Sequence, residues 1–171
     1  MNIPEHRQAI DALDAHLVKL LNERTRHVLA IGEIKIKAGE EIYAPHRERA
    51  VLQRVCKTNE GPMTHDSLRA IYREIMSSAL ALEKSMTIAY LGPEATFTHQ
   101  AAIQRFGSSL LYAAQKTIAD VFNEVAKGRA DYGVVPVENS TEGVVTHTLS
   151  TNMSSVCVTT PSVEFSTGTT P

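Results

Sequence analysis

Five charged residues stand where the helical pattern of this sequence calls for apolar ones. They are Arg24, Lys35, Arg47, Glu48 and Glu83. On a helical wheel each falls on the face that its apolar neighbours occupy, so we expect all five to point inward. Unpaired buried charges are too costly to keep without partners. Three cations beside two acids therefore favour a bound anion, most simply a carboxylate compound held by forked arginine side chains.

A structural explanation competes with this one. A single buried polar residue can set the register of a helical bundle, and a long charged side chain can reach back to water. This explanation serves for any one of the five positions as well as a ligand does. It accounts poorly for five together, because each would need its own compensation.

The first of these charges lie in one long predicted helix, from Pro4 to Lys37, which Gly39 ends. Its apolar positions are Ile3, Ile10, Leu13, Leu17, Leu20, Leu21, Val28, Ile31 and Ile34. Such a helix is roughly 50 Å long, whereas a compact module of about 90 residues is only ~30 Å across. It must therefore pack against something outside its own fold, and a second copy of the chain is the simplest partner.

The spacing of the cations also indicates a homodimer. Arg24 and Lys35 are three turns apart on one face, whereas Arg7 lies roughly 42 Å from Lys35. One small ligand cannot touch all three within a single chain. An antiparallel dimer could bring Arg7 of one chain to Arg24 and Lys35 of the other.

Composition narrows the class of protein. The chain has 171 residues, enough for one domain or two small ones, and its net charge of −2 argues against a general nucleic-acid binder. Its two cysteines form no disulfide framework, and its seven histidines lack metal-ligand spacing. No secretory signal, long apolar run or phosphate loop is present. We expect a cytoplasmic protein without metal, cofactor or membrane contact.

The chain changes character twice. Residues 1–86 predict three helices, the second opening at Pro45 and the third beginning after Thr64 with an apolar stripe that runs to Met86. Residues 87–149 alternate short strands with helices, which predicts the start of an α/β domain with a parallel sheet. Residues 150–171 hold five Ser and six Thr, and we expect a disordered tail there.

The helical segment resembles the all-helical chorismate mutase family. The resemblance rests on Arg7-x6-Asp14, Glu23-Arg24, Gly32-x2-Lys35, Arg47-Glu48 and the run from Glu74 to Glu83. It implies a three-helix domain in an intertwined homodimer that rearranges chorismate to prephenate. Each of the two active sites would borrow the first-helix arginine of the other chain.

The resemblance also assigns roles. Arg24, with Arg7 from the other chain, would bind the two carboxylates of chorismate. Lys35 and Glu83 would hydrogen-bond the ether oxygen of the breaking bond. The reaction is unimolecular, so the protein need only hold the compact conformer and stabilise charge on that oxygen.

Two further residues complete the implied site, and two depart from the family pattern. Glu48 would bind the ring hydroxyl, and Arg47 would help to orient the site. Ala44 stands where many relatives have an aspartate that shares this hydroxyl, and Ala79 where some have a serine near a carboxylate. We expect weaker substrate contacts from these changes, without loss of the chemistry.

The second segment resembles the N-terminal half of prephenate dehydratase, which implies a partial α/β domain like those of periplasmic binding proteins. The resemblance rests on Ile88–Thr98, Ala130–Ser140 and Gly143. A polar loop that includes Glu138, Asn139 and Ser140 follows a strand, at the usual binding edge of an α/β sheet. Thr96 and Thr98 stand at the start of a helix and could offer hydroxyls to a carboxylate.

Two departures weaken the dehydratase interpretation. The family's Thr-Arg-Phe motif, which supplies its catalytic threonine, occurs nowhere in these residues, so dehydratase activity is not expected here. Ala95 stands where relatives commonly have glycine, and a turn with positive φ would strain it.

Taken together, the sequence predicts a chorismate mutase of phenylalanine biosynthesis joined to an incomplete prephenate dehydratase domain. The alternative is a catalytically silent helical dimerisation module that carries a small-molecule-binding α/β fragment. The inward Arg24, Lys35 and Glu83 favour the enzyme, since a pure coiled coil would not need them together.

Overall fold

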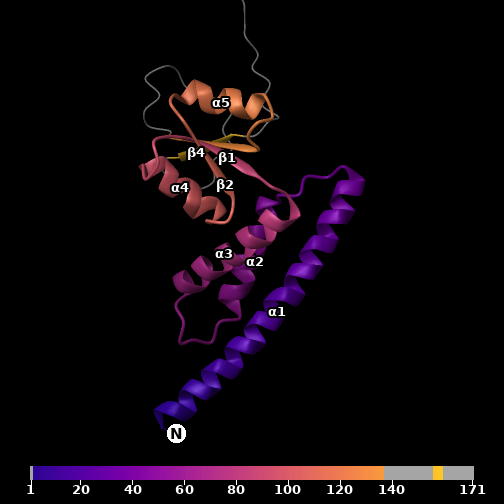
Figure 1. The fold of residues 1–171 in the computed structure, drawn as a ribbon, viewed down its shortest axis with the longest axis vertical. Coiled ribbons are helices and arrows are strands. Elements are labelled where there is room, and N and C mark those ends of the chain that lie inside the picture. The colour runs from indigo at the N-terminus through magenta and orange to yellow at the C-terminus, as the bar shows by residue number, and fades with distance from the viewer. Residues whose placement is uncertain (1, 137–155, 160–171) are drawn as a thin grey trace, which may run out of the picture. The chain divides into compact units, whose positions relative to one another are not determined.

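The computed structural model describes residues 2–136 and 156–159, and it divides into two compact units, Met1–Lys84 and Ser85–Pro171. The first unit is helical and the second is α/β, which confirms the predicted fold class (Figure 1). The predicted domain limits at residues 86 and 149 stay predictions. No helix in the described residues has the length and apolar character needed to cross a membrane.

Helix α1 runs without interruption from Ile3 to Ala38, as predicted. Asn2 caps its start: its side chain accepts a hydrogen bond from the Glu5 amide at 3.0 Å, and the Glu5 carboxylate accepts one from the Asn2 amide at 2.9 Å. Gly39 ends the helix with a φ of +69°, a left-handed conformation that glycine adopts without strain.

Most of α1 has no packing partner among the described residues. Every residue from Asn2 to Glu23 is exposed, and the helix becomes partly buried only from Arg24 onward. The exposed large apolar side chains are Ile3, Ile10, Leu13, Leu17, Val18, Leu20, Leu21, Ile31, Ile34 and Ile36. The amphipathic stripe is therefore present but uncovered in a single chain, and monomeric proteins rarely expose an apolar face of this length.

Two shorter helices complete the first unit, α2 from Pro45 to Lys57 and α3 from His65 to Glu83. Pro45 begins α2, where a missing amide proton costs nothing. Thr64 caps α3 as predicted, its hydroxyl accepting from the Ser67 amide at 3.1 Å.

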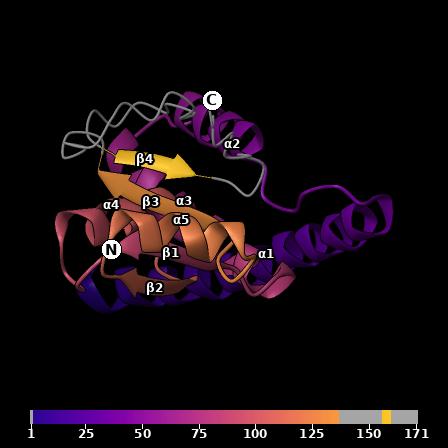
Figure 2. The same ribbon diagram turned by 90° about the horizontal axis from the view of Figure 1, so that it is seen from above.

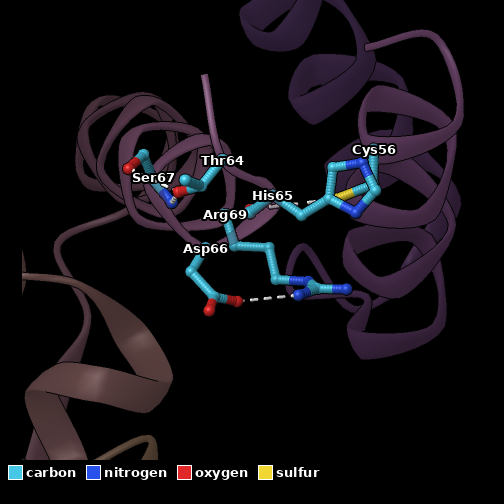
Figure 3. Close-up of polar contacts among 6 residues, drawn as sticks. All are labelled: Cys56, Thr64, His65, Asp66, Ser67 and Arg69. Atoms are coloured by element: carbon cyan, nitrogen blue, oxygen red, sulfur yellow. Dashed lines mark hydrogen bonds and ion pairs between the residues drawn. The ribbon is translucent and has the colours of Figure 1, made fainter. Parts of the chain in front are cut away.

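Figure 3 shows the polar contacts around the start of α3. The Arg69 guanidinium forms an ion pair with Asp66 at 2.9 Å, and the Cys56 thiol of α2 lies 4.0 Å from the His65 carbonyl oxygen. Both contacts are exposed, so they add little stability: the ion pair lies within the first turns of α3, and the Cys56 contact joins the end of α2 to the start of α3.

The apolar stripe predicted for α3 is only partly correct. Ser77 and Ala79 are buried, but Ile71 is exposed and Leu82 is 65% exposed. The helix ends at Glu83, so Met86 does not continue it. Met86 is instead buried in the second unit, where its carbonyl accepts a hydrogen bond from the Leu111 amide at 3.1 Å.

The second unit is a small sheet with two helices. Its elements are β1 (Thr87–Leu91), α4 (Phe97–Phe106), β2 (Leu111–Gln115), α5 (Ile118–Ala126), β3 (Tyr132–Pro136) and β4 (Val156–Thr159). The strand order is β2-β1-β3-β4, with the first three strands parallel and β4 antiparallel to β3 (Figures 1 and 2).

Helices α4 and α5 lie on opposite faces of this sheet (Figure 1). The chain crosses from β1 to β2 in one direction and from β2 over to β3 in the other, so right-handed crossovers place the helices on different sides. On one face Ala89 and Val135 pack with Val121 and Val125 of α5. On the other, Tyr90 stacks on His99 of α4 with ring centroids 4.5 Å apart.

The prediction of a disordered tail is wrong for Val156–Thr159, which forms β4 on the free edge of β3. The Ser and Thr content of the segment concealed this short run of residues with high strand propensity. The rest of residues 150–171 lie outside the described residues.

The turn after β1 is strained, as the sequence indicates. Ala95 has a φ of +62°, the one positive value among the described residues other than glycine. Gly92 in the same turn allows close packing, because a Cβ there would lie 2.9 Å from the Ala114 Cβ. An alanine in the left-handed region costs roughly 1–2 kcal/mol.

We expect Ala95→Gly to stabilise the second unit by about 0.5–1 kcal/mol, because relief of strain outweighs the extra freedom of glycine in the unfolded chain. Hydrogen exchange of residues 87–136 by mass spectrometry measures this as slower exchange. Ala126→Gly, at an exposed helical position, is the matched control and should speed exchange. Faster exchange in Ala95→Gly would contradict the strain argument.

Candidate functional site

The end of α3 meets α1 at a close contact between Glu83 and Gly32. A Cβ atom at Gly32 would lie 2.7 Å from Oε2 of Glu83 and 3.3 Å from its Cδ. Gly32 is the one residue of α1 that is fully buried. The Glu83 carboxyl therefore lies directly against the backbone of α1.

The environment of Glu83 favours its neutral form. Burial raises the pKa of Glu83 above its ordinary value, and the nearby positive charge of Lys35 opposes this without cancelling it. Glu83 thus keeps its proton to a higher pH than an exposed glutamate. A protonated carboxyl can donate a hydrogen bond, which a carboxylate cannot.

Lys35 is held by the loop that follows α1. Its Nζ donates to the Ile42 carbonyl at 2.8 Å and to the Glu41 carbonyl at 3.2 Å. An ammonium group has three donors, so these two bonds fix its position and leave one N–H for another acceptor. The charge lies on the same part of α1 as Gly32, one turn away.

Arg24 carries a buried group without a hydrogen-bond partner among the described residues. The group is the Nη1 atom of its guanidinium. A guanidinium cannot lose its charge to relieve this, and a buried donor without an acceptor is costly. Such an atom calls for an acceptor beyond the described residues, and an anion would fit.

The two charged residues of α2 differ. Glu48 is half-buried and accepts a hydrogen bond from the Tyr43 hydroxyl at 3.0 Å. Arg47 is exposed, so the prediction that it points inward is wrong for the single chain. The reason is that α2 has no fully buried residue, so its surroundings do not enclose a side chain as long as that of Arg47.

Arg7 is exposed near the start of α1. At 1.5 Å per residue it lies roughly 42 Å along the helix from Lys35, and α1 is straight enough that the two ends cannot meet (Figure 1). Within one chain the structure thus brings together Gly32, Lys35 and Glu83, and it leaves Arg7 apart.

Two residues near the site escaped the sequence argument. Gly32 was visible only as part of a motif, although glycine inside a helix is itself a signal of close packing. Tyr43 lies in a loop and gave no periodic signal, although it supports Glu48. Both act through contacts that a helical wheel does not represent.

In the second unit, the two candidate threonines, Thr96 and Thr98, take part in the fold itself. Thr96 caps α4, and its hydroxyl donates to the Pro93 carbonyl at 2.9 Å. Thr98 is buried, so the expectation that it offers a hydroxyl at the open start of the helix is wrong. Glu138, Asn139 and Ser140 lie outside the described residues.

Two family profiles match the chain, one for each unit. Residues 6–84 match the family described as "Chorismate mutase type II", and residues 88–159 match "Prephenate dehydratase". The second match extends through β4, so it includes part of the segment that composition alone had set aside as a tail.

Curated relatives contain both units in the same order. A bifunctional chorismate mutase/prephenate dehydratase from Aquifex aeolicus is 50% identical over 151 residues, covering 86% of this chain and 42% of the relative. One of the same description from Neisseria gonorrhoeae is 51% identical over 144 residues, covering 84% and 39%. The chain therefore spans about two-fifths of the length of these relatives.

A solved chorismate mutase from Thermus thermophilus is also similar, with 32% sequence identity and a TM-score of 0.47. The alignment covers 47% of this chain and 92% of that one.

Proposed function

Because residues 6–84 belong to the chorismate mutase type II family and residues 88–159 to the prephenate dehydratase family, we propose that the helical unit rearranges chorismate to prephenate on the route to phenylalanine. The observation that carries the proposal is the buried, unpaired guanidinium nitrogen of Arg24 on the same helix as Lys35. A dicarboxylate substrate supplies the acceptor that Arg24 lacks. A silent dimerisation module would have no need to bury that group unpaired.

The reaction is intramolecular: one carbon–oxygen bond of chorismate breaks while a carbon–carbon bond forms, and no atom leaves or enters. The protein therefore contributes by holding the reactive conformer and by stabilising charge. In our proposal Arg24 and Arg7 of the partner subunit bind the two carboxylates. Two charged anchors at separate points would fold the substrate into its compact form.

Lys35 and Glu83 act on the ether oxygen, where negative charge grows as the bond breaks. Lys35 has an N–H left over from its two carbonyl contacts, and its charge is fixed by the loop. The raised pKa of Glu83 keeps a proton available for donation. Both donors are in place before the reaction, so no reorganisation is needed as charge develops.

Glu48 would accept a hydrogen bond from the ring hydroxyl of the substrate, and the hydrogen bond from Tyr43 would fix the position of the Glu48 carboxylate. Ala44, which caps α2 without a side-chain hydrogen bond, contributes no second acceptor there. For Arg47 we propose a general attraction of the anionic substrate, because its side chain is exposed in the single chain.

A homodimer is part of the proposal. The exposed apolar side chains of α1 would be covered by the same helix of a second copy, related by a twofold axis. An antiparallel pairing would bring Arg7 of the partner subunit toward Arg24. We also propose a cytoplasmic location, consistent with the free thiol of Cys56.

The purified chain should convert chorismate to prephenate and form no phenylpyruvate, because its 171 residues contain no Thr-Arg-Phe sequence. Arg24→Ala should lower kcat/KM by about 100-fold, through loss of a charge-assisted contact of about 3 kcal/mol. Liquid chromatography at constant pH measures both products, with enzyme-free prephenate as the control for spontaneous conversion.

Arg26→Ala, at an exposed position two residues along α1, is the matched control and should keep its activity. A well-folded dimer that leaves chorismate unchanged would refute the proposal and favour the dimerisation module.

A mixture of inactive Arg7→Ala and Lys35→Ala chains should regain activity after unfolding and refolding together. Each mixed dimer has one site in which both groups are intact, so random pairing restores about a quarter of the wild-type sites. Each variant refolded alone is the control. If mass spectrometry detects mixed dimers but no activity returns, the site is built within one chain.

Activity should fall as the pH rises through the raised pKa of Glu83, since the carboxylate repels the charge growing on the ether oxygen. Glu83→Gln donates at every pH and should remain active with a flat profile, whereas Glu83→Ala should lose about two to three orders of magnitude in kcat. Glu60→Gln, in an exposed loop, should keep the wild-type profile. Identical profiles for wild type and Glu83→Gln would exclude Glu83 as the titrating donor.

A further inference from the structure

We propose that Gly32 is a positioning residue, whose missing side chain leaves the space that the Glu83 carboxyl occupies and so determines where that group donates its hydrogen bond. The inference rests on the proposed function, because it deepens the role of Glu83. It concerns a residue that contacts no substrate and acts through its neighbour across the α1–α3 contact.

The geometry is specific to the functional end of the Glu83 side chain. A Cβ atom on Gly32 would lie 2.7 Å from Oε2, 3.2 Å from Cγ and 3.3 Å from Cδ of Glu83. Real Cβ atoms do not approach other atoms as closely as the first of these distances. The carboxyl is therefore seated where any other amino acid at position 32 would place an atom.

Backbone conformation does not explain this glycine. Gly39, Gly61 and Gly128 have positive φ values and open space where a Cβ would be, so their role is conformational. Gly32 lies inside α1 and is not among the glycines with positive φ. Glycine is among the least favourable residues at such a position, so helix stability alone would select alanine.

The contact should respond to substitution by moving the carboxyl and not by unfolding the helix. The Cβ of an alanine is fixed to the α1 backbone, whereas Glu83 is the last residue of α3 and its carboxyl ends a flexible side chain. The carboxyl must then swing away from α1 toward water. A displacement of about 1 Å in such a group can cost roughly 100-fold in rate.

The same movement changes how Glu83 titrates. The charge that acts on Glu83 is that of Lys35 in α1, which lowers the pKa of the carboxyl. Burial dominates over Lys35 in raising the Glu83 pKa. A carboxyl that is moved into water loses this burial, so its pKa should fall toward the ordinary value.

The test compares the full wild-type chain with Gly32→Ala, Glu83→Ala and the double variant. Gly32→Ala should lower kcat by about 10- to 100-fold with a smaller change in KM, and should move the alkaline fall of the pH–rate profile to lower pH. Its thermal midpoint should equal or exceed that of the wild type. In the Glu83→Ala background the same substitution should change kcat less than about twofold, because its target is gone.

Gly39→Ala is the matched control, since it also adds one methyl group to a glycine of this region but meets nothing within 4 Å. It should lower the thermal midpoint, because its φ is +69°, and leave kcat and the pH profile unchanged. Gly32→Ala and Gly39→Ala thus have opposite expected patterns of stability and activity.

Titration of the Glu83 carboxyl by NMR provides a readout that does not depend on activity, and Gly32→Ala should lower the pKa it measures. A wild-type chain without mutase activity would refute the proposed function, while the titration would still test the contact. The inference is overturned if Gly32→Ala keeps the wild-type Glu83 pKa, or if it lowers kcat equally in the Glu83→Ala background. The inference is also overturned if Gly32→Ala unfolds the chain in both backgrounds. If Gly32→Ala unfolds only the chain that keeps Glu83, the result supports the inference that the two side chains compete for one space.

Discussion

The length of α1 is the constraint on which the rest of the first unit depends. A helix of 36 residues cannot be covered by two neighbours of 13 and 19 residues, and its first two-thirds carry apolar side chains exposed to water. Burying them stabilises by roughly 25 cal/mol per Å² of apolar surface, which is the dominant favourable term in association. The proposed homodimer is thus a consequence of chain geometry before it is a feature of catalysis. The proposed sharing of the site between chains follows from the same geometry, because Arg7 lies at the exposed end of α1.

The charges of the site differ in how they tolerate burial, and this difference suits them to different tasks. Arg24 cannot become neutral, so its buried Nη1 requires a hydrogen-bond acceptor at every pH. Lys35 donates hydrogen bonds to the Glu41 and Ile42 carbonyls, which also orient its ammonium group. Burial raises the pKa of Glu83, so this group keeps its proton to a higher pH than an exposed glutamate does. A fixed cation suits recognition of a carboxylate, whereas a retained proton suits donation to an oxygen that becomes negative only as the reaction proceeds.

Local signals in the sequence predicted α1 and the strain at Ala95 well, because Gly39 and Ala95 act through their own backbone conformation. The half-buried positions of Arg24, Lys35 and Glu83 followed from helical periodicity. Contacts between elements could not be predicted in the same way. The space beside Gly32 depends on how closely α1 and α3 approach each other, and the spacing of residues in the sequence does not give that distance. Arg47 was wrongly predicted to point inward. A helical wheel gives the direction of a side chain, but it does not show whether another element covers that side chain. Strand β4 was missed because composition was averaged over a segment in which four residues pair with β3.

The described part of the second unit is an open α/β sheet in which the order of the strands reverses between β1 and β3. Strands β1 and β3 are adjacent and parallel, while the chain leaves them in opposite directions, toward β2 from one and outward from the other. The carboxyl ends of such a pair form the crevice where ligands bind in open α/β sheets. At the end of β1 the chain places its strained Ala95, its close-packed Gly92 and the cap of α4. Backbone strain that persists at such an edge indicates a conformation maintained by its surroundings, and loops at binding sites commonly carry it. The hydroxyl of Thr96 donates to the Pro93 carbonyl, and so it helps to hold this turn in its strained conformation.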